Sequence, residues 1–253
     1  MSVSKQLGRI LIGLFLILSV PATASFAHVR KYVWTQGYET LPKGEFELES
    51  FVTLKVPDGD VSREHSWEYQ EELEYGVTDH LNIAHYERWE TQNVVGPDDS
   101  TVYKGFKFEA KYRVGEKGKY WVDPLIYVEW ITNPRERHED KNPNEIELKL
   151  ILAKDFGKFN ITYNQIMESQ FGRGGRTKQE FAVAASYEVI SEFRIGAEFT
   201  GQYWAPGSHR NELSLGPTLS WENRWFWIAA GARFGLNHVA DDVEARVIVG
   251  VPF

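Results

Sequence analysis

Charged side chains recur at alternate positions along much of the chain, and they are the groups best suited to bind or conduct ions and polar solutes. Side chains at every second position of a strand share one face, so each stretch would present its charges to one side. The charged residues predicted to face inward and line a water-filled pore are Glu45, Glu47, Glu49, Glu68, Glu72, Glu74, Lys107, Glu109, Lys111, Arg113, Glu147, Lys149, Arg194, Glu198 and Arg246.

Two arrangements of these charges fit the sequence. Like charges that face each other across a strand pair are destabilising, so the acidic stretches 44–56 and 64–76 need water, cations or facing basic groups. In one interpretation the charges neutralise one another and cross-link the wall of a closed lumen. In the other, an acidic wall faces a basic wall across a small pore suited to small polar or zwitterionic solutes.

Enzymatic chemistry has little support in the sequence. A hydrolase needs a serine and a histidine within hydrogen-bond reach, but adjacent residues of a strand point to opposite faces, which separates His65 from Ser66 and Ser208 from His209. His85 has no evident serine partner, and the histidines show no metal-ligand spacing. We predict a protein without catalytic residues, metal or cofactor, and keep an outer-membrane lipid hydrolase as a second alternative.

The first 27 residues have the pattern of a secretory signal peptide. Lys5 and Arg9 precede the apolar run 10–20, and Pro21 and small residues follow it. A run of this length is shorter than the ~20 residues that a membrane-spanning helix needs. The formal net charge is −8, and removal of the signal peptide makes it more negative, which argues against a nucleic-acid partner.

Twelve segments alternate apolar and polar residues, which is typical of strands with one apolar face. Each is about twice as long as the ~5–6 residues of an ordinary strand. Short joins alternate with longer polar ones, as in outer-membrane barrels. The segments are 44–56, 64–76, 80–92, 101–114, 119–132, 144–155, 158–170, 178–190, 193–204, 210–221, 224–236 and 241–253.

This pattern predicts a 12-stranded antiparallel transmembrane β-barrel over residues 44–253, in the outer membrane of a Gram-negative bacterium with both termini periplasmic. Irregular stretches predict a bulge or a face switch near Ala84 and a bulge near Pro124. Residues 28–43 lack the alternation. They form either a periplasmic leader or a plug in the barrel mouth.

The last segment, EARVIVGVPF, places apolar residues at every second position before a terminal Phe253. This resembles the C-terminal signature of bacterial outer-membrane barrels. The resemblance implies that the barrel assembly machinery reads this strand and that Phe253 lies at the periplasmic interface. Outer-membrane lipid is the expected surrounding, and five loop arginines could meet lipopolysaccharide phosphates, although solvated loops are the commoner case. They are Arg135, Arg137, Arg173, Arg176 and Arg210.

Two further stretches, RKYVWTQGYETLPKGEFELE and ELEYGVTDHLNIAHYE, resemble the outer-membrane proteins grouped under the MetA pathway of phenol degradation. The resemblance implies a transporter-like barrel and supplies no catalytic residues. The predicted function is therefore passive passage of small solutes, either polar or aromatic. The alternative is a closed structural or surface-binding barrel whose specificity lies in its outer loops.

Overall fold

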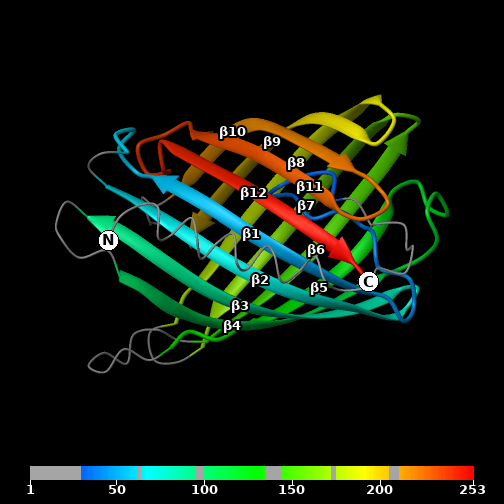
Figure 1. Ribbon diagram of the computed structural model, residues 1–253, viewed down its shortest axis with the longest axis horizontal. Coiled ribbons are helices and arrows are strands. Elements are labelled where there is room, and N and C mark those ends of the chain that lie inside the picture. The colour runs from blue at the N-terminus through cyan, green and yellow to red at the C-terminus, as the bar shows by residue number, and fades with distance from the viewer. Residues whose placement is uncertain (1–29, 62–63, 95–99, 135–143, 172–174, 205–210) are drawn as a thin grey trace.

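Twelve antiparallel strands close into a barrel in the computed structural model of the protein (Figure 1). The structure describes residues 30–61, 64–94, 100–134, 144–171, 175–204 and 211–253. The strands are β1 (Phe46–Val56), β2 (Glu64–Thr78), β3 (Leu81–Val94), β4 (Ser100–Arg113), β5 (Asp123–Ile131), β6 (Glu145–Phe156), β7 (Phe159–Gln170), β8 (Thr177–Ile190), β9 (Phe193–Trp204), β10 (Glu212–Glu222), β11 (Trp227–Gly235) and β12 (Val243–Pro252).

Strand β12 pairs with β1 as well as with β11. This closure removes both sheet edges, so every strand has hydrogen-bonding neighbours on its two sides. The predicted fold class, a closed 12-stranded antiparallel barrel, is confirmed. Among the described residues there is no helix with the length and apolar character needed to cross a membrane.

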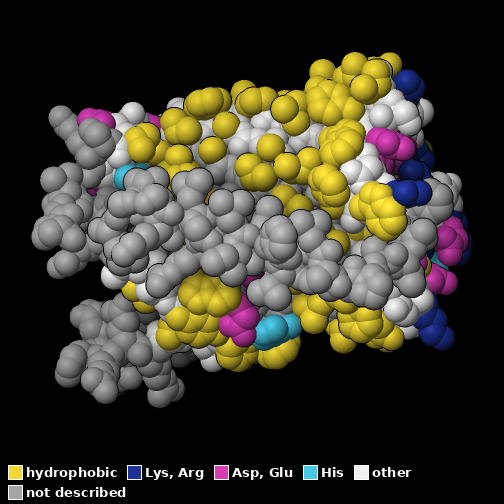
Figure 2. All heavy atoms as spheres, in the orientation of Figure 1, with side chains coloured by type: hydrophobic (Ala, Val, Ile, Leu, Met, Phe, Trp, Pro, Cys, Tyr) yellow, Lys and Arg dark blue, Asp and Glu magenta, His cyan; other side chains and the backbone are white. Residues whose placement is uncertain are grey.

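Alternate residues of each strand face the inside and the outside of the barrel. In β5, Leu125 and Tyr127 are buried in the interior, whereas Ile126 and Val128 are exposed on the outside. On the face shown in Figure 2, the outward side chains form a predominantly hydrophobic band. Period-two alternation in the sequence therefore predicted which side of each strand is apolar.

Both predicted irregularities are wrong: β3 has neither a bulge nor a face switch at Ala84, and the pairing of β5 with β6 has no bulge at Pro124. The register runs unbroken through Ala84, and the shift comes later in β3, between Arg88 and Trp89. The cause is Gly105 on β4, which has a φ of 92° and passes so close to the carbonyl of Thr132 that a Cβ would overlap it. Strand β5 begins at Asp123 rather than at 119, and the pairing of β5 with β6 is regular at its second residue, a proline.

The chain closes the barrel at the end that carries the short turns. The backbone N–H of Phe253 donates to the carbonyl of Phe46 at 2.9 Å, and their rings stack with centroids 5.7 Å apart. Phe253 thus lies at the rim, beside the start of β1. The predicted signal peptide and Arg135, Arg137, Arg173 and Arg210 lie outside the described residues.

Residues 30–43, which we call the luminal segment, enter the barrel (dark blue in Figure 1). Tyr32, Val33 and Thr35 have no exposed surface, and Tyr38 and Leu41 are also buried. The segment packs into two apolar clusters of the inner wall, so its contacts favour a plug over a leader that lies outside the barrel.

Candidate functional site

The carboxylate of Glu198 on β9 binds the backbone of the luminal segment. Its Oε1 accepts the N–H of Val33 at 2.7 Å, and its Oε2 accepts the N–H groups of Trp34 and Thr35 at 2.9 and 2.7 Å. Glu198 is only 1% exposed. Hydrogen bonds to an ionised acceptor are about twice as strong as neutral ones, so one buried side chain fixes three consecutive peptide groups.

Two asparagines of β7 hold the residues on either side of this contact. The hydroxyl of Tyr32 donates to Asn160 Oδ1 at 2.7 Å. The N–H of Gln36 donates to Asn164 Oδ1 at 2.7 Å, and Asn164 Nδ2 donates to the Gln36 carbonyl at 2.9 Å. Neither asparagine was predicted from the sequence. Their inward parity was the available signal, because polar side chains that point into a filled interior need internal partners.

Trp34 anchors the segment to β11 and β12. Its Nε1 donates to Glu244 Oε1 at 3.1 Å. The guanidinium groups of Arg233 and Arg246 lie 5.1 and 5.8 Å from the indole centroid, within the range of cation–π attraction. Arg233 also donates to Glu244 at 2.9 Å, so the indole, the carboxylate and the guanidinium groups form one connected cluster.

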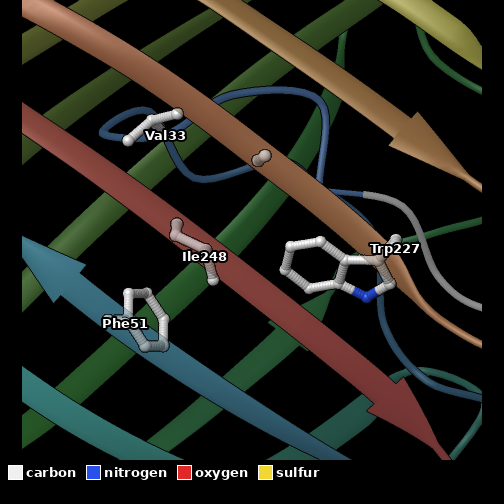
Figure 3. Close-up of a cluster of buried hydrophobic side chains, with 5 residues drawn as sticks. Val33, Phe51, Trp227 and Ile248 are labelled. Carbon is white, nitrogen blue, oxygen red and sulfur yellow. The ribbon is translucent and has the colours of Figure 1, made fainter. Parts of the chain in front are cut away.

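The apolar contacts lie next to these polar ones. Val33 packs with Phe51, Trp227 and Ile248 inside the barrel (Figure 3). Further along the segment, Tyr38 packs with a second cluster that also contains Leu125, Tyr127, Ile151 and Ala153. Clusters of this kind would be wet and unstable in an open pore, so the segment supplies the apolar surface that completes them.

The segment also carries a partly buried lysine. Burial lowers the pKa of Lys31 to about 8, and Asp155 opposes the shift while Lys117 adds to it. Lys31 forms an ion pair with Glu39 of the same segment. The docked segment therefore holds this ammonium group in a setting less favourable to its charge than water.

A row of glutamates crosses the opposite wall. Direct cross-strand pairs join Glu47 to Glu74, Glu109 to Glu129 and Glu129 to Glu147. Most members of the row have a lysine within 3.1 Å, which offsets the repulsion expected between facing carboxylates. These ion pairs are Lys111–Glu74, Lys107–Glu129, Lys149–Glu147 and Lys178–Glu168.

The remaining predicted residues lie at the ends or on other strands of the inner face. Glu49 pairs with Arg30 of the segment, and Glu68 pairs with Lys55. Arg113 and Arg194 pair with Glu116 and Glu188 near the short turns. Glu45 comes just before β1, and Glu72 and Glu109 are buried. Their inward placement agrees with the predicted parity, whereas a role in lining a conducting pore stays a prediction.

The two larger of the described cavities in the lumen lie beside the segment. Their volumes are about 280 and 220 Å³. Trp34, Glu147, Lys149 and Arg246 line both cavities, so the indole of the segment lies between them. The linings are mainly charged, amide and hydroxyl groups, which suit water and small polar solutes rather than an apolar ligand.

A cluster of polar side chains interrupts the hydrophobic outer band. Figure 2 shows acidic and histidine side chains within it. Ser50 donates to Glu71 at 2.5 Å, Glu71 faces Glu87 across β2 and β3, and Glu87 bonds His85 at 3.0 Å and Tyr103 at 2.6 Å. Ser50 and His85 thus each bond a glutamate instead of each other, so the nucleophile–base contact of a hydrolase is not formed here.

Comparison with known proteins identifies the family. The model of DUF6662, described as a family of unknown function, matches residues 24–238. The chain belongs to DUF6662. The resemblance of this DUF6662 member to the phenol-degradation family stays a prediction. No curated protein matches the chain in sequence.

Solved structures with a similar fold include two porins. The NanC porin aligns with a TM-score of 0.54 and 11% identity, over 81% of this chain and 98% of its own. The KdgM porin, solved in complex with disordered oligogalacturonate, aligns with a TM-score of 0.51 and 10% identity, over 83% of this chain and 98% of its own. At such low identity these likenesses establish the fold of the DUF6662 member and nothing about its solute.

Proposed function

We propose that this protein is an outer-membrane channel for small polar solutes and that its luminal segment closes it at rest. The observation that carries the proposal is the binding of three consecutive backbone N–H groups by Glu198. A carboxylate buried on a barrel wall needs internal partners, and here the segment supplies them. The segment is thus held as a specific ligand of the wall.

The lining of the two cavities supports a polar solute. Paired glutamates and lysines line the larger cavity and give it both signs of charge. Small zwitterions and polar molecules could hydrogen-bond to such a lining, whereas an aromatic hydrocarbon would have to displace water from charged groups. The porin fold and the resemblance to transporter-like barrels support the same class of function.

The outer-membrane setting belongs to the same proposal. The hydrophobic band, the closed sheet and the terminal Phe253 beside Phe46 fit a barrel inserted by the assembly machinery, with the short turns and both termini in the periplasm. We propose that the protein has no catalytic role. Lipid and lipopolysaccharide are its surroundings rather than substrates.

Single-channel conductance in planar bilayers tests the proposal. Glu198→Ala removes the acceptor of three hydrogen bonds and leaves a hole in the wall, so the closed state loses several kcal/mol in total, at about 1.5–3 kcal/mol for each bond to a charged group. We expect the natural protein to be mostly closed and Glu198→Ala to show long-lived openings. Glu71→Ala is the matched control, because it truncates an outward carboxylate that does not contact the segment.

Two results would contradict the proposal, and each points to a different alternative. If the natural protein and Glu198→Ala both conduct no ions although correctly folded, the closed structural barrel is the better description. If the natural protein is already fully open and Glu198→Ala does not change it, the segment is no gate. A difference in migration between unheated and heated protein in denaturing gels establishes folding for each variant.

A further inference from the structure

We propose that Glu47, Glu49 and Glu74 bind a divalent cation of the calcium class where the inner wall meets the luminal segment. Each of the three offers one carboxylate oxygen, and these oxygens lie within 4.8 Å of one another. Calcium binds oxygen ligands at about 2.3–2.6 Å, so oxygens up to about 5 Å apart can share one ion. All three side chains are at least 96% buried, as a dehydrated site requires.

Two neighbouring oxygens have no hydrogen-bond partner within the described part of the chain. The amide of Asn82 donates to Glu74 through Nδ2, so this side chain reaches the cluster, yet its Oδ1 is unpartnered. Glu72 stands directly opposite Glu49 on the same inner face, and its Oε2 is unpartnered too. Both residues are 1% exposed. Buried acceptors are normally satisfied, and a hard cation satisfies amide and carboxylate oxygens together.

The local charge points the same way. Arg30 pairs with Glu49 at 3.2 Å and Lys111 with Glu74 at 2.8 Å. Within the ranges that the structure describes, Glu47 and Glu72 have no basic side chain at ion-pair distance, and Glu47 receives only the Nε1–H of Trp227 at 3.0 Å. A buried carboxylate without a counter-charge is strongly disfavoured. A divalent ion would supply the missing positive charge.

There is also room for an ion. A cavity of about 30 Å³ is bounded by Glu47, Glu49, Glu74 and Lys111 on the wall and by residues of the luminal segment, among them Arg30, Gln36 and Leu41. About 10–15 Å³ measured in this way holds one water, so an ion with a retained water fits. Magnesium demands near-ideal octahedral ligands, whereas calcium accepts irregular sets, and ligands from two twisted strands favour calcium.

Terbium luminescence tests the site on the intact protein in detergent micelles after chelator treatment. Terbium(III) replaces calcium at oxygen sites and emits when a nearby tryptophan is excited, and Trp227 contacts Glu47 directly. We expect saturable emission that calcium displaces, and at least a tenfold loss of affinity in Glu47→Gln and in Glu49→Gln. Trp227→Phe should lose most of the emission while calorimetry still detects calcium binding.

Glu71→Gln is the matched control, since it alters the same strand as Glu74 on the outer face. Its terbium affinity should equal that of the natural protein. The proposal is overturned if the folded natural protein gives no heat of calcium binding at millimolar concentration. It is also overturned if Glu47→Gln and Glu49→Gln, whichever of them folds, keep full affinity. Neither measurement depends on whether the barrel conducts.

Discussion

The two walls of the lumen hold the same segment in different ways. The charged wall, made by β1, β2, β4, β5 and β6, carries the glutamate row and its lysines. The small-residue wall, made by β7 to β11, presents many short polar and apolar side chains to the lumen, with Glu198, Trp227 and Arg233 among them. Its buried residues include Thr162, Ala182, Ala184, Ser186, Thr218, Ser220 and Ala229.

The small-residue wall leaves room for the backbone of the luminal segment, whereas the long side chains of the charged wall extend into the lumen. Gly231 shows this most clearly, since a Cβ there would lie 3.0 Å from the Trp34 ring and 3.2 Å from Val33. On the charged wall, long side chains reach one another and leave cavities between them. Docking of the segment and the proposed passage of solutes therefore depend on different residues of one barrel.

The largest expected effect on docking of the luminal segment comes from filling the space beside Gly231. Gly231→Leu drives a side chain into the segment, and overpacking of this kind costs about 1–3 kcal/mol, or a ~5–150-fold change in the docked population. The readout is the rate of maleimide labelling of Thr35→Cys, a buried position in a chain without natural cysteine. We expect labelling to be about 100-fold faster when Gly231→Leu is combined with Thr35→Cys than in Thr35→Cys alone, which is in the upper part of this range.

Ala230→Leu is the control for that change, because Ala230 is the preceding residue of β11 and faces outward. It should leave the labelling rate of Thr35→Cys unaltered. Equal labelling of both double variants would show that the small-residue wall does not hold the segment, and the distinction between the two walls would be lost.

A smaller effect is expected from Trp34→Phe. The ring keeps its apolar contact but loses the hydrogen bond to Glu244 and part of its attraction for Arg233 and Arg246. A single hydrogen bond contributes about 1 kcal/mol net, so labelling of Thr35→Cys should rise about fivefold. Trp225→Phe is the matched control, since Arg224 covers that exposed indole at 4.3 Å on a turn outside the lumen. A rate unchanged in Trp34→Phe would contradict the anchoring role.

The smallest effect on docking is expected from the charged wall. Glu147→Gln removes one negative charge that borders both cavities and contacts Lys149. Changes at independent sites add within about 0.3–0.5 kcal/mol, so labelling of Thr35→Cys should change less than about twofold. In a Gly231→Leu background, reversal potentials should shift toward anion preference. A tenfold rise in labelling instead would show that both walls hold the segment.

Much of the fold could be predicted from the sequence because a barrel in a membrane obeys a period-two rule. The alternation in EIELKL placed Leu148 outward and Glu147 inward, and the structure agrees. The failures concern backbone geometry. Gly105 adopts a positive φ to pass Thr132, a contact between β4 and the residue that follows β5, which local pattern does not reveal.

The candidate site was predictable only in part. Parity placed Glu198 inward, but nothing in its neighbourhood indicates a ligand 165 residues away. Asn160 and Asn164 carry no charge and were overlooked, although they bind the segment from both sides of that contact. Trp34 and Trp227 are interior residues, and an aromatic residue near a strand end looks the same in sequence whether it faces lipid or lumen.

By itself the sequence determined the number of strands, their apolar faces and the closing role of the last strand, because each of these follows from local alternation and length. The tertiary structure alone decided what fills the lumen. Strand register and closure bring Glu198, Asn164, Glu244 and Gly231 around residues 33–36. Those contacts join segments far apart in the chain, and only the closed barrel fixes the distances between them.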